Sequence, residues 1–223
     1  LIGDIPKIKA ILAELGEDEA KYTFIQQDTV EDAVACAAKL FHEGTVGAMM
    51  KGKLETGQII KGVLNKDNDL RGTGLISLVG MYESPNYHKL FGITDVAINT
   101  YPDLEKKEGL IVNAVDLFHK LGVADPKVAV LCAVEKLNPK MPETVDADAL
   151  KQKNAAGEIT GCVVEGPISL DLAMVKESAE IKGYESPVAG DADILVVPDL
   201  PAGNLLAKGL TELGGCDTGG VVL

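Results

Sequence analysis

Five short polar segments, each following an apolar run, hold the residues of this chain that are best suited to bind an anionic small molecule. They cover residues 50–57, 99–103, 138–144, 165–171 and 197–204. Glycine lets a backbone approach a ligand closely, and the free N–H groups at the start of a helix favour an anion. The candidate phosphate- or substrate-binding residues of these segments are Lys51, Gly52, Thr56, Asn99, Asn138, Lys140, Glu165, Gly166, Gly203 and Asn204.

The first segment is predicted to join a buried strand at residues 46–50 to a helix. Gly52 and Gly57 permit a tight turn, and Thr56 offers a hydroxyl group, so we expect a phosphate to bind between Gly52 and Thr56. The GxxxxGK[ST] spacing of a nucleotide-binding P-loop is absent. A plain strand-to-helix turn is the alternative interpretation of this segment.

The other segments also have simpler interpretations. Asp103 and Ser169 are suited to cap the helices that follow them, whereas Asn99 is expected to be free to face a cleft. Lys140 lies in a rigid loop between two prolines and could meet a phosphate or a nucleotide. The glycine and asparagine at 203–204 lead into a helix and could present backbone N–H groups to a ligand.

No pattern of nucleophile, base and orienting acid is present. Of the three histidines, His88 in the sequence SPNYHK has the best claim to a functional role. Cys216 is a possible nucleophile near a helix end, although a lone cysteine more often packs inertly. The four cysteines are widely spread and form no CxxC pair, which argues against a zinc site or a disulfide scaffold and suits a reducing cytosol.

The charge balance limits the class of partner. The net charge is −13, with 34 acidic against 21 basic residues, and nucleic-acid backbones are bound mainly through lysine and arginine. The chain has no tryptophan, and aromatic residues make up only 4%, so stacking platforms for single strands are not expected. No apolar run approaches the length of about 20 residues that a membrane helix needs. We expect a cytoplasmic protein with no metal, no nucleic-acid partner and no membrane association.

Short apolar strands alternate with amphipathic helical patterns along the chain. This alternation predicts an α/β fold with mostly parallel sheets covered on both faces. Strands are expected at residues 46–50, 93–99, 127–134, 162–165 and 194–197. Helices are expected at residues 4–15, 29–44, 103–121, 147–155, 170–181 and 205–213.

Two lobes are expected, with a boundary near residues 122–126, where a long helix gives way to a new strand. The first lobe would cover residues 1–122 and the second residues 123–223. The first four residues read as the tail of a strand, and residues 219–223 read as a strand that has barely begun. Because a half-strand leaves an unpaired edge, we expect further sequence on both sides.

Taken together, the segments resemble the phosphate acetyltransferase and phosphate butyryltransferase family, and its butyryl branch most. The resemblance runs in order along nearly the whole chain. It rests on MKGKLETGQIIKGVLNKDNDLR, YHKLFGITDVAINTYPDLEKK, KVAVLCAVEKLNPKMPETVDADAL, CVVEGPISLDLA and SPVAGDADILVVPDLPAGNLLAKGL.

The resemblance implies a two-lobed fold of the isocitrate dehydrogenase-like group, with the active site in the cleft between the lobes and a homodimer as the assembly. It implies transfer of an acyl group between coenzyme A and phosphate, with coenzyme A as a co-substrate and no permanently bound cofactor. It also implies direct attack in a ternary complex, helped by cationic and hydroxyl groups that stabilise the developing charge.

This sequence departs from the family pattern in two ways, and these departures leave alternative functions open. The resemblance places the main catalytic residues, a Ser-Arg pair and an aspartate, beyond Leu223, so the catalytic residues are unknown in this sequence. The residues of some segments also resemble the acetyl-phosphate-forming subunit of component C of glycine, sarcosine and betaine reductases. A protein of that kind would have the other subunits of the reductase complex as partners. A non-catalytic structural lobe is the third hypothesis.

Overall fold

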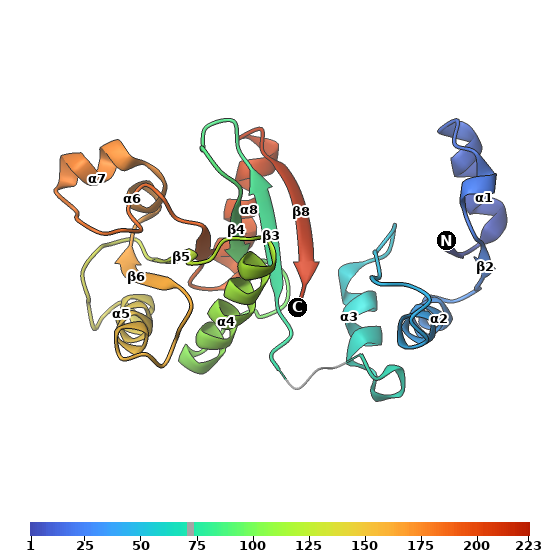
Figure 1. Cartoon of the computed structure of the whole chain (residues 1–223), viewed down its shortest axis with the longest axis horizontal. Helices are drawn as coiled ribbons and strands as arrows, with labels where there is room; N and C mark the ends of the chain where they lie inside the picture. Colours follow the sequence, from blue (N-terminus) through green and yellow to red (C-terminus); the bar gives the residue numbers. More distant parts are fainter. Residues whose placement is uncertain (71–73) are drawn as a thin grey trace. The chain divides into compact units, whose positions relative to one another are not determined.

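A computed structural model describes residues 1–70 and 74–223, together with all side chains in these ranges except that of Thr56. The chain divides into two compact units, Leu1–Thr73 (unit 1) and Gly74–Leu223 (unit 2), each drawn in Figure 1. Both units contain helices and strands, and the large sheet of unit 2 is mostly parallel. The predicted α/β class is therefore confirmed.

Unit 1 is mainly helical. Asp4 and Thr29 cap its first two helices, because each side chain accepts a hydrogen bond of 3.1 Å from the backbone N–H three residues later. Two short strands pair in parallel. Its elements are β1 (Ile2–Gly3), α1 (Ile5–Glu14), β2 (Ile25–Gln26), α2 (Val30–His42) and α3 (Thr56–Leu64), with 3₁₀ turns at Glu19–Lys21 and Lys66–Asn68.

The prediction of a strand at residues 46–50 is wrong. The chain there is irregular, and the Met50 side chain is 97% exposed. In the described part of unit 1, β1 and β2 pair only with each other, so residues 46–50 have no strand beside them. A run of apolar residues forms a strand only where a neighbouring backbone accepts its hydrogen bonds.

Unit 2 is built on one six-stranded sheet. Its strand order is β6-β5-β7-β4-β3-β8. The four strands from β6 to β4 are parallel to their neighbours, and β3 and β8 continue the sheet in antiparallel pairs. The strands are β3 (Leu78–Glu83), β4 (Phe91–Thr94), β5 (Lys127–Leu131), β6 (Val163–Ile168), β7 (Ile194–Val196) and β8 (Asp217–Val222).

Helices cover both faces of this sheet (Figure 1). One apolar cluster joins α4 and α5 to one face, and a second joins α6, α7 and α8 to the other. Alternate residues of β5 divide between the clusters: Val128 and Val130 belong to the first, Ala129 and Leu131 to the second. The helices are α4 (Leu104–Lys120), α5 (Pro142–Ala155), α6 (Leu170–Met174), α7 (Lys176–Lys182) and α8 (Leu200–Glu212).

The expected lobe boundary at residues 122–126 does not separate two units. Strand β4 precedes this segment and pairs with β7, which follows it, so residues on both sides share one sheet. Gly122 has a φ of +90° and ends α4, and the chain then enters β5 directly. The change from a long helix to a strand therefore marks a connection within unit 2, and the division of the chain lies at Thr73 and Gly74.

Several other elements differ from their predicted bounds. The single helix expected at 170–181 is two helices, separated by Val175 in an extended conformation. Helices α5 and α8 begin earlier than expected because Pro142 and Pro201 occupy positions that tolerate proline in the first turn. Strand β3 was not predicted from the sequence. Strand β8 begins at Asp217 and pairs with β3 along its whole length.

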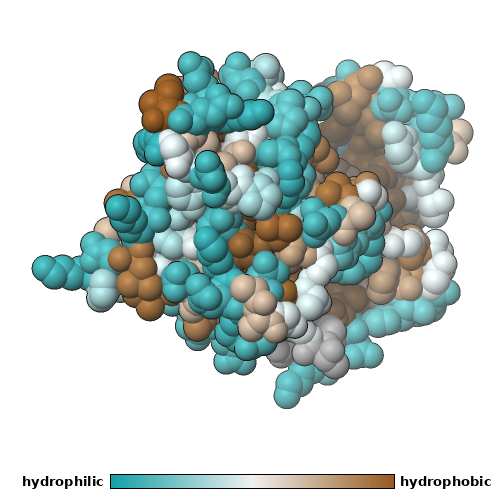
Figure 2. All heavy atoms as spheres, turned by 60° about the vertical axis from the view of Figure 1, so that its left-hand side comes forward, coloured by the Kyte–Doolittle hydropathy of each residue, from teal (hydrophilic) through white to brown (hydrophobic). Residues whose placement is uncertain are grey.

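The surface of the chain agrees with its net charge. On the face that Figure 2 presents, hydrophilic side chains predominate and hydrophobic ones form separate patches. Among residues 1–70 and 74–223, no helix is long and apolar enough to span a membrane. The same described residues contain no group of three or more His, Cys, Asp or Glu side chains placed to hold a metal ion.

Replacing Phe118 with alanine is expected to lower the free energy of unfolding of unit 2 by about 3–5 kcal/mol. Phe118 is 1% exposed in the cluster between α4 and the sheet, and it lies directly against Gly92 of β4. Val112 on the same helix is 54% exposed, so Val112→Ala is the matched control, with a change within about 0.5 kcal/mol. Urea unfolding followed by circular dichroism measures both, and equal losses would contradict the packing described here.

Candidate functional site

The four parallel strands of unit 2 end at one edge of the sheet, here called the carboxyl edge. Strands β4, β7, β5 and β6 reach it at Thr94, Val196, Leu131 and Ile168. In open α/β sheets, ligands bind in the crevice outside the carboxyl ends of the strands. Residues that directly follow these strands are therefore in position to meet a ligand.

Asp95, directly after β4, organises the first turn at the carboxyl edge. Its carboxylate is 1% exposed and accepts hydrogen bonds of 2.8, 3.0 and 3.2 Å from the backbone N–H groups of Ala97, Ile98 and Asn99. It also accepts one of 3.3 Å from the N–H of Leu78, at the start of β3. A buried carboxylate with this many donors holds its turn in one conformation.

Asn99 lies in this turn, but its side-chain amide is occupied. The Nδ2 group donates to Asp95 Oδ2 at 2.8 Å and to the carbonyl oxygen of Ile76 at 2.9 Å. The expectation that Asn99 is free to face a cleft is therefore wrong for its N–H groups. Its amide fastens the turn to the segment that precedes β3.

Gly203 and Asn204 meet the same turn from α8. A Cβ atom on Gly203 would stand 3.0 Å from the carbonyl oxygen of Asp95, so only glycine lets the helix approach this closely. Asn204 Nδ2 donates to the carbonyl oxygen of Val96 at 3.4 Å. The structure thus brings Asn99, Gly203 and Asn204 together at the turn that Asp95 organises. Their observed contacts are with the turn itself.

The loop after β5 carries the next two candidates. The backbone N–H of Asn138 donates to the Thr144 hydroxyl at 2.9 Å, and the Asn138 side-chain oxygen accepts from the N–H of Lys140 at 3.0 Å. Asn138 therefore shapes the loop. Lys140 is exposed, and the described residues give its ammonium group no hydrogen-bond or ion-pair partner. Among the candidates of unit 2, Lys140 is the cation presented to solvent at the carboxyl edge.

A carboxylate network fastens this loop to the end of β6. Glu135 accepts a 2.6 Å hydrogen bond from the Ser169 hydroxyl, and its carboxylate lies 3.3 Å from the Lys182 ammonium. The bond from Ser169 and the contact with Lys182 hold the pKa of Glu135 below its ordinary value. Ser169 occupies the N-cap position of α6, but its hydroxyl makes no capping bond.

Glu165 was expected at the end of a strand and Gly166 in the turn after it, but β6 continues through both residues to Ile168. Glu165 is buried and binds Lys151 Nζ at 2.6 Å and the Tyr184 hydroxyl at 3.1 Å. A Cβ atom on Gly166 would lie 2.9 Å from Cβ of Val130 on the next strand. Both residues have structural contacts inside the sheet, and β6 tolerates the following proline because it is an edge strand.

Lys51, Gly52 and Thr56 belong to unit 1. The Lys51 ammonium donates to the carbonyl oxygens of Gly52 at 3.3 Å and Leu54 at 2.7 Å, so it closes its own turn. Glu55 caps α3 in a reciprocal capping box with the side chain at position 58. A carboxylate already placed at this helix start disfavours a bound anion there. The side chain of Thr56 lies outside the described residues.

The cysteines are mostly buried. Burial raises the pKa of the Cys132 thiol to about 12 and that of Cys162 to about 11, and nearby carboxylates contribute. Cys216 is 8% exposed in the apolar cluster beneath α8, and its N–H bonds the carbonyl of Leu210. These surroundings favour packing for Cys216 over the nucleophilic role considered above.

Asp95 was not among the predicted site residues, although the sequence offered a signal for it. An aspartate that directly ends an apolar run commonly bonds the backbone N–H groups that follow it. Its neighbour Thr94 was also not predicted. Thr94 is fully buried, and its hydroxyl oxygen has no hydrogen-bond partner among the described residues.

The fold and the site define an α/β protein whose polar turns cluster at the carboxyl edge of a mostly parallel sheet, as in enzymes that bind small anionic substrates there. The family described as "Phosphate acetyl/butaryl transferase" matches residues 8–223. The chain belongs to this family.

Individual relatives agree with this assignment. The chain is 39% identical to phosphate butyryltransferase of Clostridium acetobutylicum, over the whole chain and 74% of that protein. It is 42% identical to phosphate acetyltransferase of Rhizobium meliloti, over the whole chain and 71% of that protein. Its structure resembles a branched-chain phosphotransacylase from Enterococcus faecalis V583 with a TM-score of 0.82 and 34% identity, covering 93% of this chain and 74% of that one.

Replacing Asp95 with asparagine is expected to destabilise unit 2 by about 2–3 kcal/mol, because the amide group of asparagine would face N–H donors that the carboxylate now satisfies. Asp199→Asn is the matched control. Asp199 caps α8 by accepting a bond from the N–H of Ala202, and asparagine caps a helix equally well. Thermal unfolding measures both variants, and similar stabilities would show that the Asp95 network contributes little.

The thiols are expected to differ in reactivity at pH 8. A thiol with a pKa of about 12 stays protonated at this pH, with only about one thiolate in 10⁴, so Cys132 should react with a disulfide reagent only after unfolding. Cys162 and Cys216 are buried too, whereas Cys36 is half-buried and should react first. A Cys36→Ser variant should lose the fast phase. Fast reaction of all four thiols in the folded protein would be inconsistent with this burial.

Proposed function

We propose that this chain is a phosphate acyltransferase that moves an acetyl or butyryl group between a thiol and inorganic phosphate. The observation that carries the proposal is the family match over residues 8–223, together with relatives at 39% and 42% identity named phosphate butyryltransferase and phosphate acetyltransferase. The turns at the carboxyl edge of unit 2 supply a setting of the kind in which α/β enzymes bind small substrates.

Coenzyme A is proposed as the thiol. In the direction of acyl phosphate formation, a phosphate oxygen attacks the thioester carbonyl, the new C–O bond forms, and the C–S bond breaks. The thiolate leaves and takes up a proton. Direct transfer of this kind requires orientation and electrostatic stabilisation, and no covalent enzyme intermediate. The burial of Cys132, Cys162 and Cys216 supports a reaction without a cysteine nucleophile.

Within unit 2, Lys140 is the candidate proposed to contact a phosphate group of a substrate. It is exposed in the loop after β5, and Glu135 and Asn138 hold that loop in place. An ammonium group on a fixed loop attracts an anion without the cost of ordering a long segment. A homodimer and a cytoplasmic location remain part of this proposal.

The two alternatives raised by the sequence are not needed to account for the chain. The relatives named above are phosphate acyltransferases, so the reductase-component hypothesis adds a partner that the resemblance does not require. The hypothesis of a non-catalytic structural lobe is likewise unnecessary, because membership of the family already accounts for the chain.

The activity is tested by incubating the full protein with acetyl-CoA or butyryl-CoA and phosphate, and measuring free thiol together with acyl phosphate. We expect both products to form in equal amounts, with full dependence on phosphate. Thiol release without acyl phosphate would indicate a thioester hydrolase, and no turnover with either substrate would refute the proposal.

A Cys216→Ala variant belongs to the same assay. Because direct transfer uses no enzyme nucleophile, we expect its rate to stay within about twofold of the unchanged protein, whereas loss of a covalent nucleophile costs several orders of magnitude. Cys36→Ala is the matched control for loss of a thiol elsewhere. A large loss in Cys216→Ala alone would favour a covalent acyl-cysteine.

A further inference from the structure

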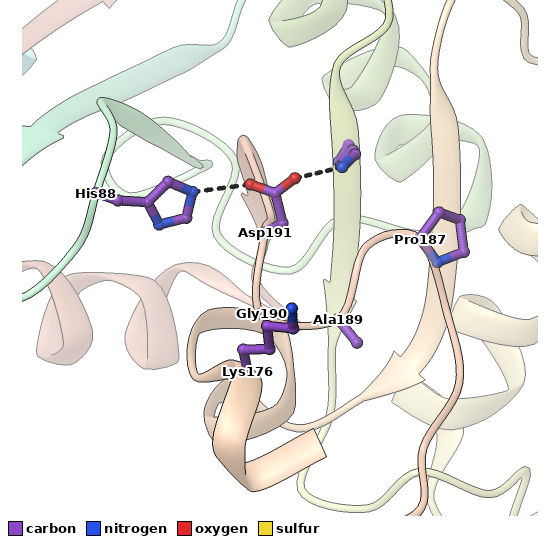
Figure 3. A pocket seen from close by; sticks show the side chains of 7 residues that line it. His88, Lys176, Pro187, Ala189, Gly190 and Asp191 are labelled. Carbon is purple, nitrogen blue, oxygen red and sulfur yellow. Dashed lines mark hydrogen bonds and ion pairs between the residues drawn. The ribbon is translucent and has the colours of Figure 1, made fainter. Parts of the chain in front are cut away.

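A second polar site lies at the opposite edge of the unit 2 sheet, where the parallel strands begin. A cavity of about 400 Å³ opens there beside His88, Lys127, Lys176 and Asp191, with Pro187 and Ala189 forming an apolar wall (Figure 3). Lys127 is the first residue of β5, and Asp191 lies shortly before β7 begins. The cavity is therefore separate from the turns at the carboxyl edge.

Asp191 is the carboxylate around which the cations gather. His88 Nε2 lies 2.9 Å from Asp191 Oδ1, Lys89 Nζ lies 2.9 Å from the same oxygen, and Lys127 Nζ donates to Oδ2. Partial burial raises the pKa of Asp191, but the hydrogen bonds from Lys127, Lys89 and His88 outweigh it and hold this pKa below its ordinary value. Asp191 is therefore ionised at neutral pH and fixes three basic side chains, two from the adjacent residues His88 and Lys89 and one from Lys127.

These side chains differ in how many donors they have left. Lys89 is saturated: its ammonium contacts Asp191 Oδ1 at 2.9 Å, the Asp191 carbonyl at 2.8 Å and Asp193 Oδ1 at 2.7 Å. Lys89 does not line the cavity. Lys127 Nζ has Asp191 as its only side-chain or backbone acceptor among the described residues, and an ammonium carries three protons.

The other two basic side chains of the lining have unused nitrogen capacity as well. His88 uses one ring nitrogen on Asp191, which leaves Nδ1; this nitrogen is a donor when the imidazole is protonated and an acceptor when it is neutral. Lys176 has a single distant ionic neighbour, Glu180 at 4.0 Å, and its side chain is 80% exposed. Figure 3 shows the His88 ring directed at Asp191, with the Lys176 side chain below them beside Gly190. The side chains with unused donors are thus those that line the cavity.

The charge of the lining contrasts with that of the whole chain. The chain carries −13, yet the lining has two ammonium groups and an imidazole against the single carboxylate of Asp191. Lys127 and His88 are held by one carboxylate beside the open cavity, so these two side chains would lose little side-chain entropy on binding a second anion. A phosphate group offers several acceptor oxygens and suits converging lysines.

We propose that this cavity binds a phosphomonoester of a small organic molecule. The phosphate would accept hydrogen bonds from Lys127, Lys176 and His88. The volume of about 400 Å³ lies in the range of sites for small organic ligands and exceeds what inorganic phosphate fills. The apolar wall formed by Pro187 and Ala189 would contact the organic part. The proposal does not depend on the acyltransferase reaction.

The imidazole of His88 provides a local readout. The chain has only three histidines, and the other two lie elsewhere: His42 contacts the carbonyl of Asn68, and His119 contacts the carbonyl of Gly161. In the full protein, at fixed pH and ionic strength, titration with phenyl phosphate is followed by proton NMR of the imidazole Hε1 signals, assigned with a His88→Gln variant. We expect a saturable shift of the His88 signal, with the signals of His42 and His119 unmoved.

A Lys176→Gln variant tests the site and should leave the fold intact, because Lys176 is exposed and makes no contact with the Asp191 carboxylate. Losing one charged donor is expected to raise the dissociation constant about tenfold. Lys120→Gln removes the same charge from an exposed position on α4 and should leave the constant unchanged. Lys127→Gln should weaken binding in the same direction as Lys176→Gln, provided that its unfolding curve shows a folded protein.

Three other probes decide the class of ligand. Benzoate has the same ring with a carboxylate, and equal binding of benzoate would overturn the assignment to phosphate. Inorganic phosphate that bound as tightly as phenyl phosphate would overturn the organic part of the proposal. A shift that stays linear, or that potassium chloride reproduces, would overturn the site altogether, as would a Lys176→Gln variant with an unchanged constant.

Discussion

The carboxylate of Asp95 is the contact on which the arrangement of the carboxyl edge depends. Placed directly after β4, it binds the N–H groups of its own turn and that of Leu78 at the start of β3. The turn it fixes is the surface against which Gly203 of α8 packs. One buried charge therefore sets where β4 stops, how β3 enters the sheet and how closely α8 approaches. Because a buried carboxylate without donors is costly, these three features form together.

The two edges of the unit 2 sheet use carboxylates in different ways. At the carboxyl edge, the carboxylate of Asp95 accepts hydrogen bonds from neutral N–H donors and holds the nearby backbone in one conformation. At the opposite edge, Asp191 binds three basic side chains, and two of them, His88 and Lys127, line a cavity. The first arrangement stabilises a turn, and the second leaves donors for a ligand. The difference lies in the partners, since both residues are aspartates close to the end of a strand, Asp95 just after β4 and Asp191 shortly before β7.

Several elements could be predicted from local sequence because their determinants are local. The caps Thr29 and Asp103 bond N–H groups three residues away, so a short window of sequence contains both partners. Strands β5 and β7 are continuous apolar runs buried on both faces, a pattern that a parallel sheet requires. The residues expected in a strand at 46–50 are also apolar, but hydrogen-bonding partners in another part of the chain decide whether such a run becomes a strand.

The sequence by itself therefore determined the class of fold, most of the helices and the family, because apolar periodicity, caps and long ordered resemblance are all properties of the linear chain. Only the tertiary structure decided which polar residues act together. Asn99 was expected to face a ligand and is held by Asp95, and Gly166 was expected in the turn after a strand and lies inside β6. His88 and Asp191 are 103 residues apart and meet because β4 and β7 are adjacent in the sheet. Such pairings depend on strand order, which local sequence does not encode.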